Sequence, residues 1–175
     1  RTLKLNSNAF KGSYFFRWKH SSFYLADRGN FGRFKVQYNA LFSRSGKAEY
    51  EEKCAPSKGF LATRKLILHA GIDSGSVKYS PNGAPFLISG KHLSITHSKT
   101  QAGIAIGDHS LGFDIEEYHL KIQNIAPKFL HKEEYYAIES HNPIETLTRI
   151  WTAKEALYKA LNVPGISFSK QLLIN

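Results

Sequence analysis

The sequence predicts an α+β fold, in which strands cluster apart from helices and short turns join them. Residues 93–98 alternate apolar and polar side chains, as a half-buried strand does. Residues 146–161 instead repeat apolar side chains at the spacing of an amphipathic helix. The chain of 175 residues is long enough for one compact body with a proper core.

The first 45 residues are rich in aromatic side chains and predict short strands and turns. Residues 27–30 (DRGN) are typical of a turn, and a helix is expected near residues 36–42. Pro56 and Ser57 then favour the start of an amphipathic helix that ends at Gly71.

The second half of the chain begins after a turn at residues 81–85. The expected elements are strands at 93–98, 102–106 and 111–116, helices at 122–140 and 146–161, and a strand at 166–174. Only four residues separate the second and third of these strands, so we expect them to form a hairpin. Pro127 interrupts the first helix, and Pro164 with Gly165 ends the second.

The charge balance favours an anionic partner. The chain has 24 Lys and Arg against 14 Asp and Glu, a formal net charge of +10. The basic residues are scattered and form no run of five or more, which disfavours nucleic acid as that partner.

The composition also predicts a cytoplasmic protein. Cys54 is the single cysteine, so no intrachain disulfide can form. No apolar run is long enough to span a bilayer, and the first residues do not have the pattern of a signal peptide. We expect no membrane partner.

Two carboxylates stand at alternate positions of the strand predicted at 111–116. Asp114 and Glu116 share one face of that strand, and Phe113 and Ile115 share the other. Paired carboxylates are suitable ligands for Mg²⁺. The same alternation is also expected of a strand whose polar face meets solvent.

A third carboxylate lies on the helix predicted at 146–161. Glu155 and Lys159 are one helical turn apart, an arrangement that fits a metal-bound phosphate and equally fits a surface ion pair. Lys154 falls within the apolar stripe of the helix. Its ammonium can reach a phosphate or a carboxylate, or its stem can lie over Trp151 while the charge reaches water.

Further candidate phosphate ligands are His97, Ser98 and Arg64. His97 and Ser98 close a predicted strand, and Arg64 lies on the apolar-periodic face of its helix. Each can donate hydrogen bonds to a phosphate. A structural histidine and an arginine paired with a carboxylate are the alternatives.

The sequence lacks the motifs of several classes of enzyme. The chain contains no Cys-x-x-Cys pair, no Gly-x-x-x-x-Gly-Lys loop and no Gly-x-Ser-x-Gly elbow. Zinc, P-loop and serine-hydrolase chemistry are therefore unsupported.

In combination, five segments resemble the 4'-phosphopantetheinyl transferases of the larger, surfactin-type class. They are FLATR at 60–64, NGAP at 82–85, SITHS at 94–98, GFDIE at 112–116 and W-x-x-K-E-A-x-x-K at 151–159. The resemblance covers roughly residues 60–168, and its last two motifs are the most specific.

The resemblance implies a pseudo-dimer of two similar α/β halves in one chain. Residues 1–90 would form the half that contacts coenzyme A and the carrier, and residues 91–175 the half with the metal site and catalytic helix. A single compact, monomeric unit is expected.

The activity that the resemblance implies is transfer of the phosphopantetheine arm of coenzyme A to a serine of an apo acyl, peptidyl or aryl carrier protein. Adenosine 3',5'-bisphosphate would be released. Asp114, Glu116 and Glu155 would bind Mg²⁺, or Mn²⁺, at the pyrophosphate. Glu155, directly or through water, would be the base for the serine, and Lys159 would neutralise or protonate the departing bisphosphate.

The other cofactor contacts follow from the same resemblance. Arg64, His97 and Ser98 would bind the 3'-phosphate or nucleotide end, Asp114 would contact the pyrophosphate through the metal, and Lys159 would contact the departing bisphosphate. Lys154 is also expected among the cofactor ligands, from its place in the apolar stripe. The family's turn lysine is Ala84 here, and Lys78, Lys91 or an N-terminal basic residue could replace it. Candidate carrier-docking residues are Lys128, Lys132, Lys159 and Lys170.

Three other readings remain open. A metal-dependent nuclease also gathers acidic residues and lysine, but its usual Glu-x-Lys lies on a strand, whereas Lys154, Glu155 and Lys159 lie on a predicted helix. A basic nucleic-acid-binding module needs none of the three carboxylates. A trimeric acyl-carrier-protein synthase is disfavoured because a whole half precedes the metal motif.

Overall fold

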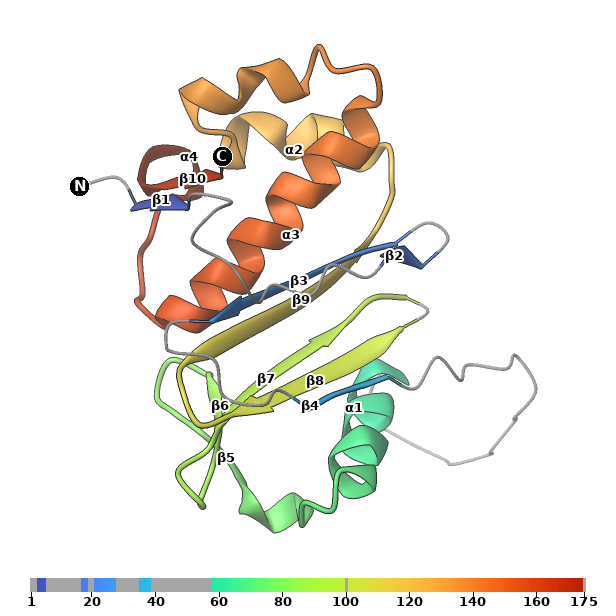
Figure 1. The fold of residues 1–175 in the computed structure, drawn as a ribbon, viewed down its shortest axis with the longest axis vertical. Coiled ribbons are helices and arrows are strands. Elements are labelled where there is room, and N and C mark those ends of the chain that lie inside the picture. The colour runs from blue at the N-terminus through green and yellow to red at the C-terminus, as the bar shows by residue number, and fades with distance from the viewer. Residues whose placement is uncertain are drawn as a thin grey trace, which may run out of the picture.

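The computed structural model describes the backbone of residues 3–5, 17–18, 21–27, 35–38, 58–99 and 101–174, and side chains within residues 59–99 and 101–174. Two sheets lie between two helices (Figure 1). Helix α1 (Lys58–His69) lies on the outer side of one sheet, and helix α3 (Pro143–Leu161) on the outer side of the other. The predicted α+β class is confirmed.

The sheet next to α1 has five antiparallel strands. Their order is β4 (Lys35–Tyr38), β8 (Ala102–Gly107), β7 (His92–His97), β6 (Pro85–Leu87) and β5 (Val77–Tyr79). A 3-10 turn, η2 (Ser74–Ser76), leads into β5. Leu66 and Ile67 of α1 pack on Leu87, Leu93 and Ile104 to form the core of this lobe.

The second sheet has three antiparallel strands and is covered by α3. Its order is β2 (Arg17–Trp18), β3 (Ser21–Asp27) and β9 (Leu111–Glu117). Helix and strand approach closely at Gly112, where an added Cβ would lie 1.8 Å from the carbonyl oxygen of Ala156. Because strand residues alternate between faces, Asp114 and Glu116 lie on the same α3-facing side as Gly112.

Two hydroxyl side chains join the sheets. The Ser94 Oγ of β7 accepts a hydrogen bond from the N–H of Phe113 at 2.9 Å, and the Thr96 Oγ1 accepts one from the N–H of Ile115 at 3.2 Å. Strand β7 lies inside its own sheet, between β6 and β8. The N–H groups of β9 therefore bind side chains of β7, whose backbone pairs with β6 and β8.

Local signals explain the length of α3. The Asn142 Oδ1 accepts a hydrogen bond from the N–H of Glu145, and Pro143 occupies the first turn. The helix ends at Asn162, whose backbone is left-handed with φ of 50°. The helix thus begins three residues before the predicted start at 146.

A buried ion pair anchors the middle of α3. Lys154 and Glu134 are both inaccessible to solvent, and their Nζ and Oε2 atoms are 2.5 Å apart. The Lys154 ammonium also donates to the backbone oxygens of Phe129 (2.7 Å), Leu172 (2.9 Å) and Phe168 (3.2 Å). One side chain therefore binds four other segments of the chain, at residues 129, 134, 168 and 172.

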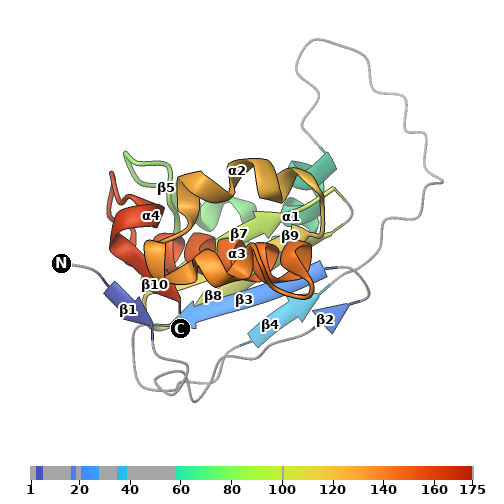
Figure 2. The ribbon, with the colours of Figure 1, turned by 90° about the horizontal axis from the view of Figure 1, so that it is seen from above.

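Glu134 extends this network. Its Oε2 accepts a hydrogen bond from the N–H of His131 at 2.8 Å, and its Oε1 accepts one from the N–H of Ile174 at 2.7 Å. The segments held in this way are α2 (Lys121–Phe129), η3 (Lys132–Ala137), α4 (Phe168–Gln171) and β10 (Leu172–Ile174). Strand β10 pairs in parallel with β1 (Leu3–Leu5), and the two lie side by side in Figure 2.

The predicted hairpin at 102–116 is wrong. Strand β8 pairs with β4 and β7, whereas β9 pairs with β3, so the two strands belong to different sheets. Leu111, Phe113 and Ile115 of β9 pack on Ala105 of β8 instead. The three-residue connection, residues 108–110, therefore carries the chain from one layer to the next.

Other predicted boundaries also change. Residues 35–38 form a strand and not part of the helix expected at 36–42, whose remaining residues lie outside those described. The helix expected at 122–140 divides, because Leu130 and His131 adopt extended backbone angles between α2 and η3. Within the strand expected at 166–174, residues 168–171 form the short helix α4 and only residues 172–174 form a strand.

The helices expected at 56–71 and 146–161 are confirmed by α1 and α3. The pseudo-dimer and the division at residue 90 stay predictions, and the five-stranded sheet takes strands from both sides of that division. In the described parts of the chain, no helix combines the length and apolar character needed to cross a membrane.

Replacing Lys154 by Met should lower the free energy of unfolding by about 3–5 kcal/mol, because the Glu134 carboxylate stays buried without its cation. The double variant Lys154→Met, Glu134→Leu should recover part of this loss, because no unpaired charge remains. Urea denaturation of the three proteins measures both effects. Equal stability of the wild type and Lys154→Met would contradict a structural role for the pair.

Candidate active site

The Asp114 carboxylate is buried beneath α3, with 4% of the residue exposed. Its Oδ1 accepts hydrogen bonds from the Lys159 Nζ at 2.7 Å and the Thr96 Oγ1 at 3.0 Å. Its Oδ2 is also buried, and among the described residues it has no hydrogen-bond partner. An unpaired buried carboxylate oxygen is costly, so this atom is a candidate ligand for a cation. Alternation alone had also allowed a strand face open to solvent, and the burial of Asp114 excludes this.

Glu116 lies two residues further along β9 and is half-buried. Its Oε1 accepts a hydrogen bond from the Trp151 Nε1 at 2.9 Å. Burial raises the pKa of Glu116, the Trp151 hydrogen bond opposes that shift, and the Asp114 charge adds to it. The two strand carboxylates therefore act on each other electrostatically.

Glu155 completes the acidic cluster from α3. Its pKa is raised to about 7, first by burial and then by the Asp114 charge, with Lys159 opposing and Glu116 adding. A carboxyl group with this pKa is close to half-ionised at neutral pH. Such a group can accept a proton and still release it again.

The cluster therefore joins three carboxylates and one ammonium, as the sequence predicted for Asp114, Glu116, Glu155 and Lys159. When all are ionised the group has an excess of negative charge, which a divalent cation would neutralise. Within residues 58–99 and 101–174, no three acidic, histidine or cysteine side chains already enclose a metal position. The donor chemistry and the unpaired Asp114 Oδ2 nevertheless fit a hard cation.

A cleft of about 350 Å³ adjoins this cluster. Residues 82–85, Ser94 and Tyr158 line it together with Lys159, the member of the cluster through which the two adjoin; the three carboxylates are not among its lining residues. The Asn82 Nδ2 donates to the Asn162 Oδ1 at 2.6 Å and joins the turn to the end of α3. The turn that carries Ala84 thus forms a wall of the cleft.

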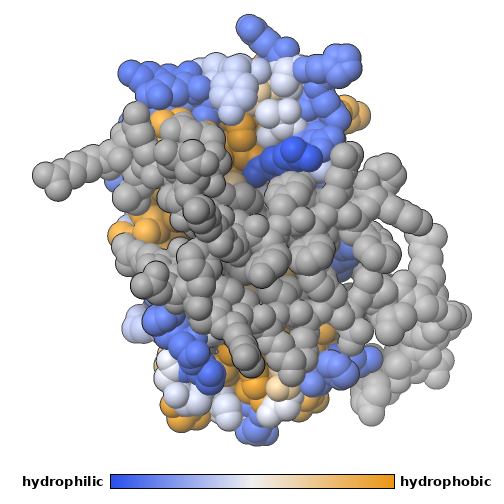
Figure 3. Space-filling view, viewed as in Figure 1, coloured by the Kyte–Doolittle hydropathy of each residue, from blue (hydrophilic) through white to orange (hydrophobic). Residues whose placement is uncertain are grey.

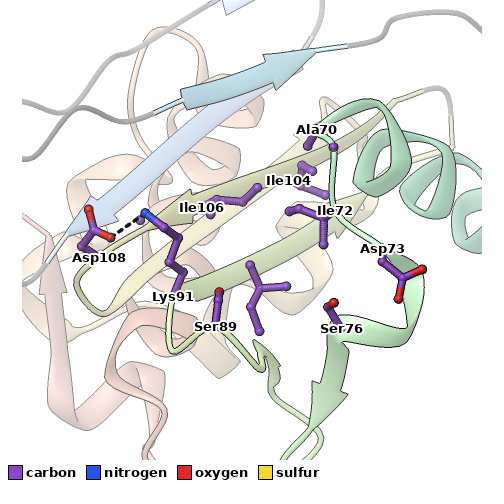
Figure 4. A pocket seen from close by; sticks show the side chains of 12 residues that line it. Ala70, Ile72, Asp73, Ser76, Ser89, Lys91, Ile104, Ile106 and Asp108 are labelled. Atoms are coloured by element: carbon purple, nitrogen blue, oxygen red, sulfur yellow. Dashed lines mark hydrogen bonds and ion pairs between the residues drawn. The ribbon is translucent and has the colours of Figure 1, made fainter.

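A larger cavity of about 560 Å³ lies elsewhere, near the ends of α1 and β8 (Figure 4). Ile72 and Ile104 line it, and Lys91 and Asp108 form an ion pair of 2.7 Å at its side. It contains none of the predicted catalytic or metal-binding residues. Lys91, one candidate replacement for the missing turn lysine, is thus at this cavity and not at the cleft.

The predicted phosphate ligands occupy other positions. His97 is exposed and lies over Gly59 at the start of α1, where an added Cβ would be 2.6 Å from the imidazole. The Ser98 Oγ donates to the Glu117 Oε1 at 2.7 Å. Arg64 donates to the backbone oxygen of Ser74 at 3.4 Å and lies over the Phe60 ring, 5.0 Å from its centre. The structure therefore does not bring Arg64 to the carboxylate cluster, and its cofactor role stays a prediction.

Lys154 requires a correction. The sequence had offered it as a cofactor ligand, but its side chain is inaccessible and its ammonium is bound by Glu134 and three backbone oxygens. It points into the core, whereas Glu155, the next residue, belongs to the acidic cluster. We therefore assign Lys154 to the fold and not to the cofactor.

Sequence reasoning missed Thr96 and Trp151 as partners of the carboxylates. Thr96 lies between the apolar positions of its strand, and alternation alone assigns such a residue to solvent. In the structure that face is covered by β9, and Thr96 is 5% exposed. The signal available was the run of hydroxyls at alternate positions, Ser94, Thr96 and Ser98.

Part of the chain is similar in sequence to known proteins. Residues 110–173 match the family model described as the 4'-phosphopantetheinyl transferase superfamily. The protein named "4'-phosphopantetheinyl transferase gsp" from Aneurinibacillus migulanus is 30% identical over 109 residues, which are 59% of this chain and 46% of that protein. The chain thus spans about half the length of this curated relative. Residues 110–173, which include β9 and α3, are thus similar to the 4'-phosphopantetheinyl transferase superfamily.

Proposed function

We propose that the protein is a 4'-phosphopantetheinyl transferase of the larger, surfactin-type class. It transfers the phosphopantetheine arm of coenzyme A to a serine of an apo carrier protein and releases adenosine 3',5'-bisphosphate. The observation that carries this proposal is the cluster of Asp114, Glu116 and Glu155 with Lys159, beside a cleft that Lys159 lines. The family match and the name of the relative support it.

Asp114, Glu116 and Glu155 would hold a Mg²⁺ ion, with Mn²⁺ as an alternative. A bound divalent cation would neutralise charge on the pyrophosphate of coenzyme A. Among the described residues, the Asp114 Oδ2 has no other partner. Burial is the main cause of the raised pKa values of Glu116 and Glu155, repulsion from Asp114 adds to it, and the cation would relieve that repulsion.

Glu155 is the proposed base. Its carboxylate accepts the proton of the carrier serine hydroxyl as the serine oxygen forms a bond to phosphorus. The phosphorus–oxygen bond to the adenosine bisphosphate breaks in the same displacement. The pKa of about 7 is that of the metal-free protein, and the bound cation would lower it, so that the carboxylate would be ionised and able to take this proton near neutral pH.

Lys159 is proposed to stabilise the leaving group. Its Nζ is held at 2.7 Å by the Asp114 Oδ1 and at 3.3 Å by the Phe113 backbone oxygen. These contacts orient the ammonium before substrate binds, so its hydrogen bond to the departing phosphate oxygen costs little reorganisation. The cleft lined by Lys159 and residues 82–85 is the proposed place for part of coenzyme A.

The carrier protein is proposed to be acidic. The formal charge of +10 would attract it over long range. Lys128, Lys132 and Lys170 are exposed and are the proposed docking residues. In Figure 3, hydrophilic residues gather at the end of the molecule that holds α2 in Figure 1.

The protein incubated with Mg²⁺ and coenzyme A should add the mass of one phosphopantetheine group to an apo carrier. Mass spectrometry of acyl, peptidyl and aryl carriers measures the shift, and a carrier whose modified serine is replaced by alanine serves as the control. EDTA should abolish the reaction. The absence of a shift on every carrier type would refute the proposed function.

Asp114→Asn should reduce transfer by at least about 100-fold, because it removes a charged metal ligand and the partner of Lys159. Asp108→Asn is the matched control, since Asp108 is exposed, pairs with Lys91 and lies at the other cavity. Turnover should be measured with saturating coenzyme A, and folding by circular dichroism. Near-normal turnover of folded Asp114→Asn would contradict the assigned role.

The metal-free protein should lose stability as pH rises from about 4.5 to about 7. Glu155 has a raised folded-state pKa of about 7 against a usual value of 4.5, so the folded state retains a proton that the unfolded chain has released. The full shift corresponds to at most about 3 kcal/mol, and Glu116, with its pKa raised as well, adds in the same direction.

Urea denaturation at pH 5 and pH 8 in EDTA measures this loss. Glu155→Gln should flatten the dependence, whereas Glu133→Gln, at an exposed position of η3, should leave it unchanged. A Glu155→Gln protein with the full wild-type pH dependence would show that the raised pKa of Glu155 is not its source.

A further inference from the structure

Each strand carboxylate of the cluster has one oxygen bound by a side chain from a neighbouring element. The Thr96 Oγ1 of β7 donates to the Asp114 Oδ1 at 3.0 Å, and the Trp151 Nε1 of α3 donates to the Glu116 Oε1 at 2.9 Å. Neither donor carries a charge. Both are therefore suited to orient a carboxylate without competing with a cation for its charge.

The orientation of Thr96 is determined by a second hydrogen bond. Its hydroxyl oxygen accepts from the N–H of Ile115 at 3.2 Å, so the single hydroxyl hydrogen is free to point to Asp114. Both residues are buried, Thr96 at 5% and Asp114 at 4% exposure. In this position Asp114 directs Oδ1 to Thr96 and Lys159, and Oδ2 stays without a partner among the described residues.

The orientation of Trp151 is determined by aromatic packing. Its ring centre is 5.1 Å from that of Phe129 at an interplanar angle of 61°, and 5.6 Å from that of Phe168. The indole has only one N–H, and these contacts direct it to Glu116. The Lys154 ammonium binds the backbone oxygens of the same two phenylalanines, so the packing that holds the indole is itself anchored.

We propose that Thr96 and Trp151 are positioning residues for a divalent cation, each binding one oxygen of a carboxylate so that the other oxygen is presented to the ion. The inference rests on the proposed function, because it takes Asp114 and Glu116 as metal ligands. Partners of this kind orient ligands and reduce the freedom that binding would otherwise remove. The two residues act through Asp114 and Glu116 and do not touch the reacting atoms.

Direct binding of Mn²⁺ tests the proposal without reference to turnover. Free Mn²⁺ is measured by electron paramagnetic resonance during titration of the full chain. Thr96→Val and Trp151→Phe should each weaken Mn²⁺ binding on the order of 10-fold, because the carboxylate loses its fixed orientation. Excess Mg²⁺ should restore most of the transfer rate in both variants.

Two controls separate positioning from stability. Thr96→Ser keeps the hydroxyl and should bind Mn²⁺ like the wild type. Leu66→Ala leaves a cavity in the core of the α1 lobe, away from the carboxylates, so it should lower the unfolding midpoint with little change in Mn²⁺ affinity. If Thr96→Val does not fold, Trp151→Phe, which retains an aromatic ring, still tests the proposal.

Unchanged Mn²⁺ affinity in folded Thr96→Val and Trp151→Phe would overturn the proposal, as would a wild-type chain that binds no Mn²⁺. An equal loss of affinity in Thr96→Ser and Thr96→Val would also overturn it. If the wild type and the variants bind Mn²⁺ as expected but no carrier is modified, the proposed function fails and the positioning role stands.

Discussion

The close approach of α3 to β9 is the constraint on which the site depends. At Gly112 the helix backbone occupies the space where any side chain would begin, 1.8 Å from the Ala156 oxygen. This contact leaves no room for a layer of side chains between strand and helix. The carboxylates of β9 consequently meet Glu155 and Lys159 at short range, and burial and repulsion shift the pKa values there. The small residues at 112, 156 and 160 thus allow the close packing that raises the pKa values of Glu116 and Glu155.

The motif on α3 combines two separate tasks in adjacent residues. Lys154 points into the core and binds Glu134, whereas Glu155 contributes to the acidic cluster on another side of the helix. The buried ion pair costs solvation energy, which its backbone acceptors partly offset. These contacts fix the rotation of α3 about its own axis at Lys154, the residue next to the proposed base Glu155. A hydrophobic residue at 154 could fill the space but could not bind Phe129, Phe168 and Leu172 by their backbone oxygens.

Elements that follow from the local periodicity of apolar residues were predicted from the sequence, whereas contacts between distant segments were not. The α+β class, α1 and α3 follow from local patterns, and the spacing of Asp114 with Glu116 predicts that both lie on one face. The failures concern distant contacts. A short loop after β8 suggested a hairpin, but hydroxyls at 94 and 96 join β7 to β9 across two sheets instead. Likewise, no pattern in the sequence shows that residues 134, 168 and 172 surround Lys154, because their proximity arises only in the folded chain.

The partners of Lys154 also bear on the order in which the chain can fold during synthesis. Helix α3 leaves the ribosome before residues 168–172, which provide two of the backbone oxygens bound by the ammonium, and before Ile174, whose N–H binds Glu134. Until those residues emerge, the Lys154 ammonium lacks two of the backbone oxygens that accept its hydrogen bonds. We therefore expect α3, and with it the acidic cluster, to reach its final position only after residues 168–174 have been synthesised.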